Sequence, residues 1–173
     1  MTFKETSYYQ KHKGKKTSNE TVEMDDYELT SLEGMPTKVD GSVYLADNDL
    51  SSLKGISREI TEDCSLSGNA SLKTLEHSPK KVNGQFAVSR VSLKSLKGMP
   101  EYIGRDFLLY EGNYTREWLL EELSKYSKVI KGAVTYDVDN DKQYITRSDI
   151  EDYRKNNVKM KKKLGSFGKF LDL

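Results

Sequence analysis

Few side chains in this sequence combine the type and the spacing that catalysis or metal binding requires. His12 and His77 are the only histidines, and a catalytic histidine needs a partner nucleophile or acid. The signature patterns G-x-S-x-G, H-E-x-x-H, G-x-x-x-x-G-K-[S/T] and G-x-G-x-x-G do not occur. The single cysteine, Cys64, leaves no internal disulfide and no cysteine-based zinc cluster. We therefore expect a protein without catalytic activity and without a cofactor.

Three acids at alternate positions, Asp137, Asp139 and Asp141, resemble the start of a calcium-binding loop. Such a loop needs a glycine after the third acid and a bidentate glutamate at its twelfth position. Lys142 and Ser148 occupy those two places. The segments on either side have the alternating composition of strands, so the acids predict the turn of a β-hairpin rather than a metal site.

The charge of the chain is nearly balanced but unevenly distributed. The 28 basic and 27 acidic residues leave a net charge of +1. Residues 1–18 hold five lysines and one glutamate, residues 19–28 hold five acids and no base, and residues 151–173 hold seven basic residues and three acids.

The basic C-terminal segment is a candidate second contact, because clustered lysines neutralise phosphates. The residues concerned are Lys159, Lys161, Lys162, Lys163, Phe167 and Phe170. A lysine-rich helix end is also ordinary solvated surface, and the near-neutral total charge argues against a dedicated nucleic-acid binder. Nucleic acid is therefore the less favoured partner.

An internal repeat indicates the elements that would position any binding residue. S-L-E-G-M-P at residues 31–36 returns as S-L-K-G-I-S at 52–57, T-L-E-H-S-P at 74–79 and S-L-K-G-M-P at 95–100. Two leucine series keep a spacing of 21 or 22 residues, namely Leu29, Leu50, Leu72 and Leu93, and Leu32, Leu53, Leu75 and Leu96. A fixed period of this length predicts a solenoid, in which each repeat buries its apolar face against its neighbours.

Each repeat continues with a segment in which apolar residues stand at every second position, which predicts a strand with one buried face. Three positions are apolar in all four repeats and form the predicted inward ladders Val39/Ile60/Val82/Ile103, Val43/Cys64/Phe86/Phe107 and Leu45/Leu66/Val88/Leu109. Cys64 is therefore interpreted as a small core residue rather than a nucleophile. His77 replaces the turn glycine of the third repeat and is expected at a corner of the solenoid.

The segment L-T-S-L-E-G-M-P-T-K-V-D-G-S-V-Y-L-A-D-N-D-L-S-S-L-K-G resembles the leucine-rich repeats of uncharacterised bacteriophage proteins. The resemblance covers about residues 29–113. It implies a phage or bacterial origin and a non-catalytic scaffold. The asparagine ladder usual in such repeats is present at Asn48 and Asn69, displaced at Asn113, and replaced by Val91 in the third unit.

We predict an α/β protein in three parts. Residues 25–113 form a short leucine-rich-repeat solenoid of about four ~21-residue coils with parallel strands. Residues 114–173 form a C-terminal helix–hairpin–helix cap with an apolar tail. Its first helix starts after Thr115, and a Ser148–Glu151 capping box opens a basic helix that runs to about Leu164.

The ends of the chain carry weaker patterns. Residues 1–24 show no apolar periodicity and are expected to be a flexible basic and acidic arm. No stretch has the composition of a secretory signal or the length of a membrane span, which favours a cytoplasmic location and no membrane partner.

The outward positions of the predicted strands are the remaining candidates for function. A sheet face without core contacts should be polar, yet Tyr44, Leu108 and Tyr110 occupy it. Tyrosine is enriched in binding surfaces because it buries much area at a low entropy cost. Leu108 and Tyr110 are equally explained by packing under the C-terminal cap near Trp118, whereas Tyr44 lies too far away for that. The predicted partner-binding residues are Tyr44, Asp63, Gln85, Asp106, Leu108 and Tyr110.

These patterns lead to the hypothesis of a non-catalytic protein–protein interaction module. By analogy with the phage repeats, we hypothesise a phage-encoded protein in the host cytoplasm that binds and modulates a host protein, in host takeover or counter-defence. Two alternative hypotheses are a nucleic-acid-associated protein that uses the basic C-terminal helix, and a minor structural component of a virion.

Overall fold

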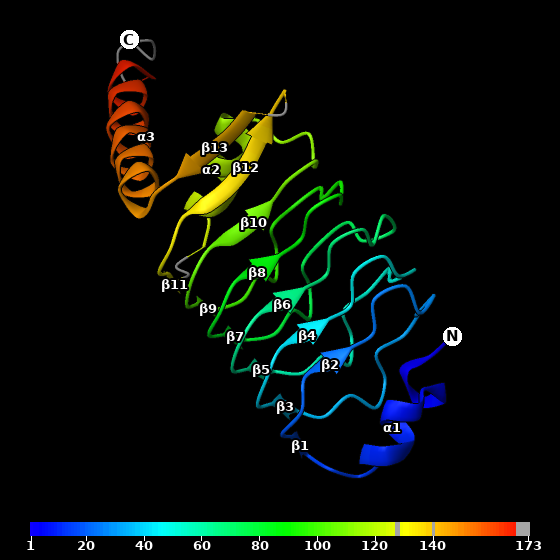
Figure 1. The fold of residues 1–173 in the computed structure, drawn as a ribbon. Helices are drawn as coiled ribbons and strands as arrows, with labels where there is room; N and C mark the ends of the chain where they lie inside the picture. The colour runs from blue at the N-terminus through cyan, green and yellow to red at the C-terminus, as the bar shows by residue number, and fades with distance from the viewer. Residues whose placement is uncertain (127–128, 140, 169–173) are drawn as a thin grey trace.

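The chain forms a solenoid in which successive coils stack along one axis. The computed structural model describes residues 1–126, 129–139 and 141–168. Figure 1 shows the N terminus and helix α1 at one end of the stack and helix α3 at the other. Coils of ~21 residues each contribute one short strand to each of two sheets, so the predicted short α/β repeat solenoid with parallel strands is confirmed.

The six-stranded sheet lies along one side of the solenoid and is parallel throughout, in the order β1-β3-β5-β7-β9-β11. Its strands are β1 (Thr17–Ser18), β3 (Lys38–Val39), β5 (Glu59–Ile60), β7 (Lys81–Val82), β9 (Tyr102–Ile103) and β11 (Val129–Ile130).

The seven-stranded sheet has the order β13-β12-β10-β8-β6-β4-β2 and is parallel except for its last pair. Its strands are β2 (Val22–Glu23), β4 (Val43–Tyr44), β6 (Cys64–Ser65), β8 (Phe86–Ala87), β10 (Phe107–Leu109), β12 (Val134–Val138) and β13 (Asp141–Ile145). The antiparallel pair β12–β13 confirms the hairpin that was predicted around residues 139–141.

The core runs through the middle of the coils and consists of the predicted ladders. All twelve ladder residues are at most 1% exposed, and the eight repeated leucines of the turns are buried as well. The alternation along each segment places these side chains inward. One detail of the prediction is wrong: each alternating segment is two short strands in different sheets, because the chain bends at the corner between them.

The turn of each repeat depends on a residue in the left-handed region. Gly34, Gly55 and Gly98 adopt φ values of 103°, 98° and 83°, which glycine tolerates because it has no Cβ. At Gly55 an added Cβ would lie 2.7 Å from the carbonyl oxygen of Leu32 in the previous coil. His77 adopts φ 68° in the third repeat, at the corner predicted for it.

Buried asparagines join neighbouring coils on the inside of the turns. Asn69 is fully buried, and its Oδ1 accepts the Leu50 N–H at 3.0 Å. Its Nδ2 donates to the carbonyl oxygens of Leu45 and Leu66, each at 2.9 Å. Asn48 bonds the preceding coil in the same way. The asparagine ladder therefore satisfies backbone groups that water does not reach.

Tyr114 continues this ladder where the sequence offers no asparagine. Its hydroxyl accepts the Leu93 N–H at 2.9 Å and donates to the carbonyl oxygen of Val91. Asn113, predicted as the displaced ladder residue, is instead exposed at φ 55°. The prediction is wrong by one position because the longer tyrosine side chain reaches the same backbone groups.

Residues 1–24 are an ordered N-terminal cap, so the predicted flexible arm is wrong. A 3-10 helix η1 (Phe3–Glu5) and helix α1 (Ser7–His12) precede β1 and β2, which add a coil before the first recognised repeat. Phe3 is 1% exposed and its N–H donates to the carbonyl oxygen of Ser31 at 2.9 Å. The arm is ordered because it covers the apolar interior of the first coil, which would otherwise be open to water.

The C-terminal cap follows the predicted order of helix, hairpin and helix. Helix α2 (Arg116–Ser124) begins after Thr115, whose hydroxyl accepts the Trp118 N–H as predicted. Strand β11 then continues the six-stranded sheet. Residues 116–126 and 129–138 therefore belong to one further coil, in which α2 takes the place of the leucine turn.

Helix α3 (Arg147–Gly168) begins earlier and ends later than predicted. Its capping box joins Thr146 and Asp149 rather than Ser148 and Glu151: the Thr146 hydroxyl accepts the Asp149 N–H, and the Asp149 carboxylate accepts the Thr146 N–H. Gly165 lies inside the helix. No helix in the described part of the chain is both long and apolar enough to cross a membrane.

A buried carboxylate joins α2 to the last leucine turn. Glu122 Oε2 accepts the Leu96 N–H and the Ser95 hydroxyl, each at 2.8 Å, and Glu122 Oε1 lies 2.6 Å from Lys125 Nζ. Burial alone would raise the pKa of Glu122, but the bonds from Lys125, Leu96 and Ser95 outweigh it and lower this pKa below its ordinary value.

Candidate binding face on the seven-stranded sheet

One row of side chains crosses the outer face of the seven-stranded sheet from end to end. Strand pairing aligns these residues one per strand, and their inward neighbours are the core ladders. In strand order the row, called here the outer row, is Glu23, Tyr44, Ser65, Ala87, Leu108, Thr135 and Tyr144. Small side chains in its middle therefore lie between larger ones towards the two ends.

The N-terminal end of the outer row is acidic and aromatic. Glu23, Asp25, Tyr27 and Tyr44 line a shallow hollow there. Tyr27 is 42% exposed and Tyr44 is half-buried. Asp25 Oδ1 accepts the Ala46 N–H at 2.6 Å, which fixes its carboxylate at the rim. Two carboxylates beside two ring faces suit a cationic group of a partner.

The C-terminal end of the outer row combines two tyrosine rings with a lysine. Lys142 Nζ lies 5.6 Å from the ring centroid of Tyr110 and 5.5 Å from that of Tyr144. Interaction with Tyr110 raises the pKa of Lys142, and a lysine is charged at neutral pH even at its ordinary pKa. Tyr144 is 55% exposed. Asp137 pairs in register with Lys142 on the same face, so a carboxylate accompanies the ammonium at this end, whereas the N-terminal end is acidic.

Leu108 and Tyr110, predicted either for binding or for packing under the cap, lie beside the hairpin. Leu108 pairs in register with Thr135 of β12, and Tyr110 contacts Lys142 of β13. In the C-terminal cap, Trp118 instead stacks on Tyr114, and the distance between their ring centroids is 5.0 Å. Both predicted residues remain half-buried.

Three predicted contact residues, Asp63, Gln85 and Asp106, have structural roles at the corner between the sheets. Asp63 Oδ1 accepts the Gln85 N–H at 2.7 Å, and Asp106 Oδ1 accepts the Ala133 N–H at 2.9 Å. Gln85 Nε2 donates to Asp106 Oδ2 at 3.4 Å. Outward polarity in the sequence did not distinguish a contact residue from one that bonds the next coil. Tyr44, Leu108 and Tyr110 lie on the outer face and the other three at the corner, and partner binding by all six stays a prediction.

The predicted second contact lies on α3 and on the residues that follow it. Lys159 is an exposed residue of α3. Lys161, Lys162, Lys163 and Phe167 belong to the same helix, but their side chains lie outside the described part of the chain, as does Phe170 entirely. Figure 1 places α3 at the C-terminal end of the solenoid, beyond β13.

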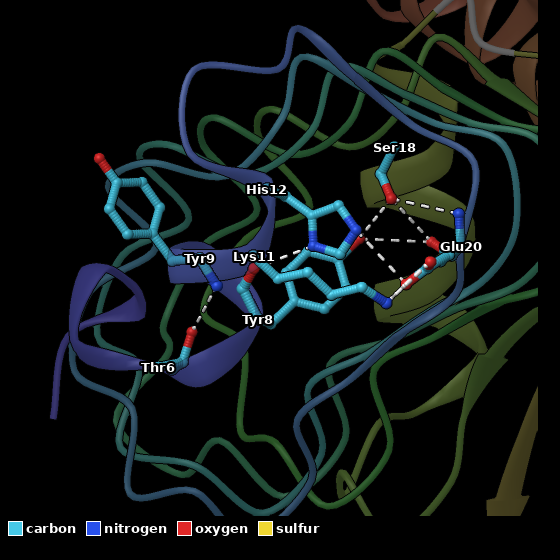
Figure 2. Close-up of polar contacts among 7 residues, drawn as sticks. All are labelled: Thr6, Tyr8, Tyr9, Lys11, His12, Ser18 and Glu20. Atoms are coloured by element: carbon cyan, nitrogen blue, oxygen red, sulfur yellow. Dashed lines mark hydrogen bonds and ion pairs between the residues drawn. The ribbon is translucent and has the colours of Figure 1, made fainter.

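A polar cluster in the N-terminal cap contains a histidine, a serine and a carboxylate, and Figure 2 shows how these groups lie. His12 is buried; its Nδ1 lies 2.9 Å from the Tyr8 carbonyl oxygen and its Nε2 lies 3.3 Å from Glu20 Oε2. Ser18 Oγ lies 2.5 Å from the Tyr8 hydroxyl. In a catalytic triad one ring nitrogen would face the serine. Here both face other acceptors, so the cluster connects α1 to the first coil rather than activating Ser18.

Electrostatic contacts strengthen this cluster. Lys11 Nζ lies 2.9 Å from both carboxylate oxygens of Glu20. Bonding to Lys11, with a smaller contribution from His12, lowers the pKa of Glu20. Burial raises the pKa of Tyr8, whose ring stacks on His12 at 4.3 Å. Sequence analysis missed this cluster because its members lie in the segment expected to be flexible.

The remaining chemical candidates are either buried or dispersed. Cys64 lies in the core ladder, and burial raises the pKa of its thiol. The described residues contain no group of three or more His, Cys, Asp or Glu side chains that could hold a metal ion.

Comparison with known proteins gives no match to a family model, to a curated protein or to a solved structure. The likeness of the repeats to phage sequences therefore stays a prediction.

Proposed function

We propose that the protein is a non-catalytic protein-binding module and that its contact surface is the outer face of the seven-stranded sheet. The observation that carries the proposal is the outer row. In it the large side chains of Tyr44 and Leu108 stand on either side of the small residues Ser65 and Ala87. The extended sheet face is the usual binding surface of a solenoid. Large side chains such as Tyr44 contribute contact area, and the small residues between them let a partner approach the strands.

The dimensions of the face suit one partner segment. Tyr44 and Leu108 stand on β4 and β10, three strand spacings apart in the sheet order, which corresponds to about 14 Å. A strand, a helix or a loop of a globular partner fits between them. The acidic end at Glu23 and Asp25 differs in charge from the end at Lys142, where Asp137 accompanies the ammonium, and this difference would fix the direction in which the partner lies.

The biological setting of this proposal rests on the repeat sequence. The likeness to phage repeats supports a phage-encoded protein that binds and modulates a host protein in the host cytoplasm. A nucleic-acid-associated role through α3 and a structural role in a virion are alternatives, and the following experiment distinguishes them from the main proposal.

The experiment is affinity capture from bacterial lysate with the full chain and two variants. Tyr44→Ala removes a half-buried tyrosine from the outer row, and the matched control Tyr102→Ala removes a half-buried tyrosine from β9 of the six-stranded sheet. We expect one stoichiometric protein that survives nuclease and high salt, is lost with Tyr44→Ala and is retained with Tyr102→Ala. Equal retention by both variants would place the contact elsewhere.

Two other results of the same experiment would favour the alternatives. Recovery of only nuclease-sensitive material that high salt removes would support a nucleic-acid role, because phosphate contacts weaken steeply with salt. Sedimentation with assembled particles would support a virion component.

A further inference from the structure

A cavity of about 220 Å³ lies at the C-terminal end of the solenoid, between the last coil and α3. Its walls are apolar: Leu123 of α2, Val134 of β12 and Ile145 of β13 are buried core residues, and Ile150 of α3 packs against that core. Its polar lining includes Arg147, Glu151 and Arg154 of α3. The cavity is separate from the outer row, and the inference from it is independent of the proposed binding face.

The cavity follows from the way the repeat ends. In the last coil α2 replaces the leucine turn, so no further turn supplies leucines to fill the space beyond it. Helix α3 is attached there by polar contacts: Arg154 donates to the carbonyl oxygens of Leu123, Ser124 and Tyr126 at 3.1, 3.1 and 2.5 Å. Arg116 Nη2 also lies 2.7 Å from Asp149 Oδ1. The Arg154 bonds attach α3 to the end of α2, and the Arg116 ion pair attaches it to the start of α2. The first turns of α3 form one wall of the cavity.

Basic residues outnumber acidic ones in the lining of the cavity. Arg147 Nε lies 2.9 Å from Glu151 Oε1, which balances one positive charge. The guanidinium of Arg154 bonds neutral carbonyl oxygens, so its charge is not balanced by these bonds. Among the charged lining residues Arg147, Glu151 and Arg154, one net positive charge therefore remains beside an apolar interior. The three carbonyl bonds use Nε and Nη2 of Arg154, so its Nη1 is the group that can donate a charge-assisted hydrogen bond to a carboxylate.

We propose that this cavity is a binding site for a small amphipathic carboxylate. The apolar body of the ligand lies among Leu123, Val134, Ile145 and Ile150, and its carboxylate contacts Arg147 and Arg154. An apolar cavity of about 150 Å³ is enough to bind benzene. The larger volume here admits a ring with a short acidic chain.

The test uses phenylacetate as the probe, with phenylacetamide and phenethylamine as neutral and cationic analogues of similar size. Binding to the full chain is followed by NMR of the isoleucine methyl groups and by calorimetry. We expect phenylacetate to shift the methyl signals of Ile145 and Ile150 and to bind about tenfold more tightly than phenylacetamide, because a charge-assisted bond is stronger than a neutral one.

Two variants and their controls locate the site. Ile150→Phe should fill the cavity and abolish phenylacetate binding, whereas Val158→Phe, an exposed position of the same helix, should leave it unchanged. Arg147→Gln should weaken phenylacetate but not phenylacetamide, whereas the exposed Arg58→Gln should affect neither.

Three results would overturn the proposal. The first is the absence of methyl shifts at about 10 mM phenylacetate, a concentration that detects even millimolar affinity. The second is equal binding of the acid, the amide and the amine. The third is the absence of nuclear Overhauser contacts between the ring and the Ile145 methyl group in the unmodified protein, a measurement that does not depend on whether a variant folds.

Discussion

Replacement of Asn69 by leucine tests whether the buried asparagine ladder holds the coils together. The substitution keeps the approximate size of the side chain and removes its hydrogen bonds. It leaves the Leu50 N–H and the carbonyl oxygens of Leu45 and Leu66 without their partners, at a position that is 0% exposed. Each unsatisfied group costs about 1–3 kcal/mol.

The expected loss in the free energy of unfolding is about 4 kcal/mol for Asn69→Leu. The three unsatisfied groups outweigh the roughly 2 kcal/mol that a buried leucine side chain returns. A loss of this size is a large part of the total stability of a domain, which is about 5–15 kcal/mol.

The assay is urea unfolding followed by circular dichroism, with hydrogen exchange at the Leu50 amide as a local measurement. The control is Asn83→Leu, at an exposed corner position, which should change stability by less than about 0.5 kcal/mol. A loss below about 1 kcal/mol for Asn69→Leu, with unchanged exchange at Leu50, would show that the ladder is not what joins these coils.

Three further changes test the caps. Phe3→Ala should lower the free energy of unfolding by about 3–5 kcal/mol, because it empties a buried site in the N-terminal cap; a change near zero, measured by urea unfolding, would restore the flexible-arm interpretation. Tyr114→Phe should cost about 1–3 kcal/mol through the lost bonds of its hydroxyl, and faster hydrogen exchange at the Leu93 amide would check this. Because the folded state lowers the pKa of Glu122, this residue stabilises the fold above its unfolded pKa, and that stability is lost as the pH falls through its folded pKa. Glu122→Gln should therefore make the unfolding free energy less dependent on pH in the acidic range, and equal pH profiles for both proteins would contradict the role of the ion pair with Lys125.

The sequence was most informative where burial repeats. The ladder that contains Val43, Cys64, Phe86 and Phe107 could be predicted because every coil places the same position against its neighbours. The cap at Thr115 was readable because it acts on an N–H only three residues away. The box predicted at Ser148 and Glu151 instead forms two residues earlier, at Thr146 and Asp149. The hairpin of β12 and β13 also rests on pairing between near neighbours.

The candidate site was only partly predictable. Tyr44 could be recognised because it is a large side chain at an outward position. The sequence could not show that Asp63 and Asp106 bond the backbone of the next coil, because these bonds join residues more than twenty positions apart. It also could not show that Tyr144 joins the outer row, because the hairpin reaches that row through the pairing of β12 with β10.

The sequence alone determined the period, the inward ladders and therefore the solenoid, because these depend on a pattern that every coil repeats. Only the tertiary structure decided how the two ends close, since each end buries its apolar surface against residues that do not recur. Phe3 covers the first coil without any periodic signal, and α3 covers the last coil incompletely and leaves the cavity beside Ile150. The outer row also belongs to the tertiary structure, because its residues align only when the strands from β2 to β13 stand side by side in one sheet.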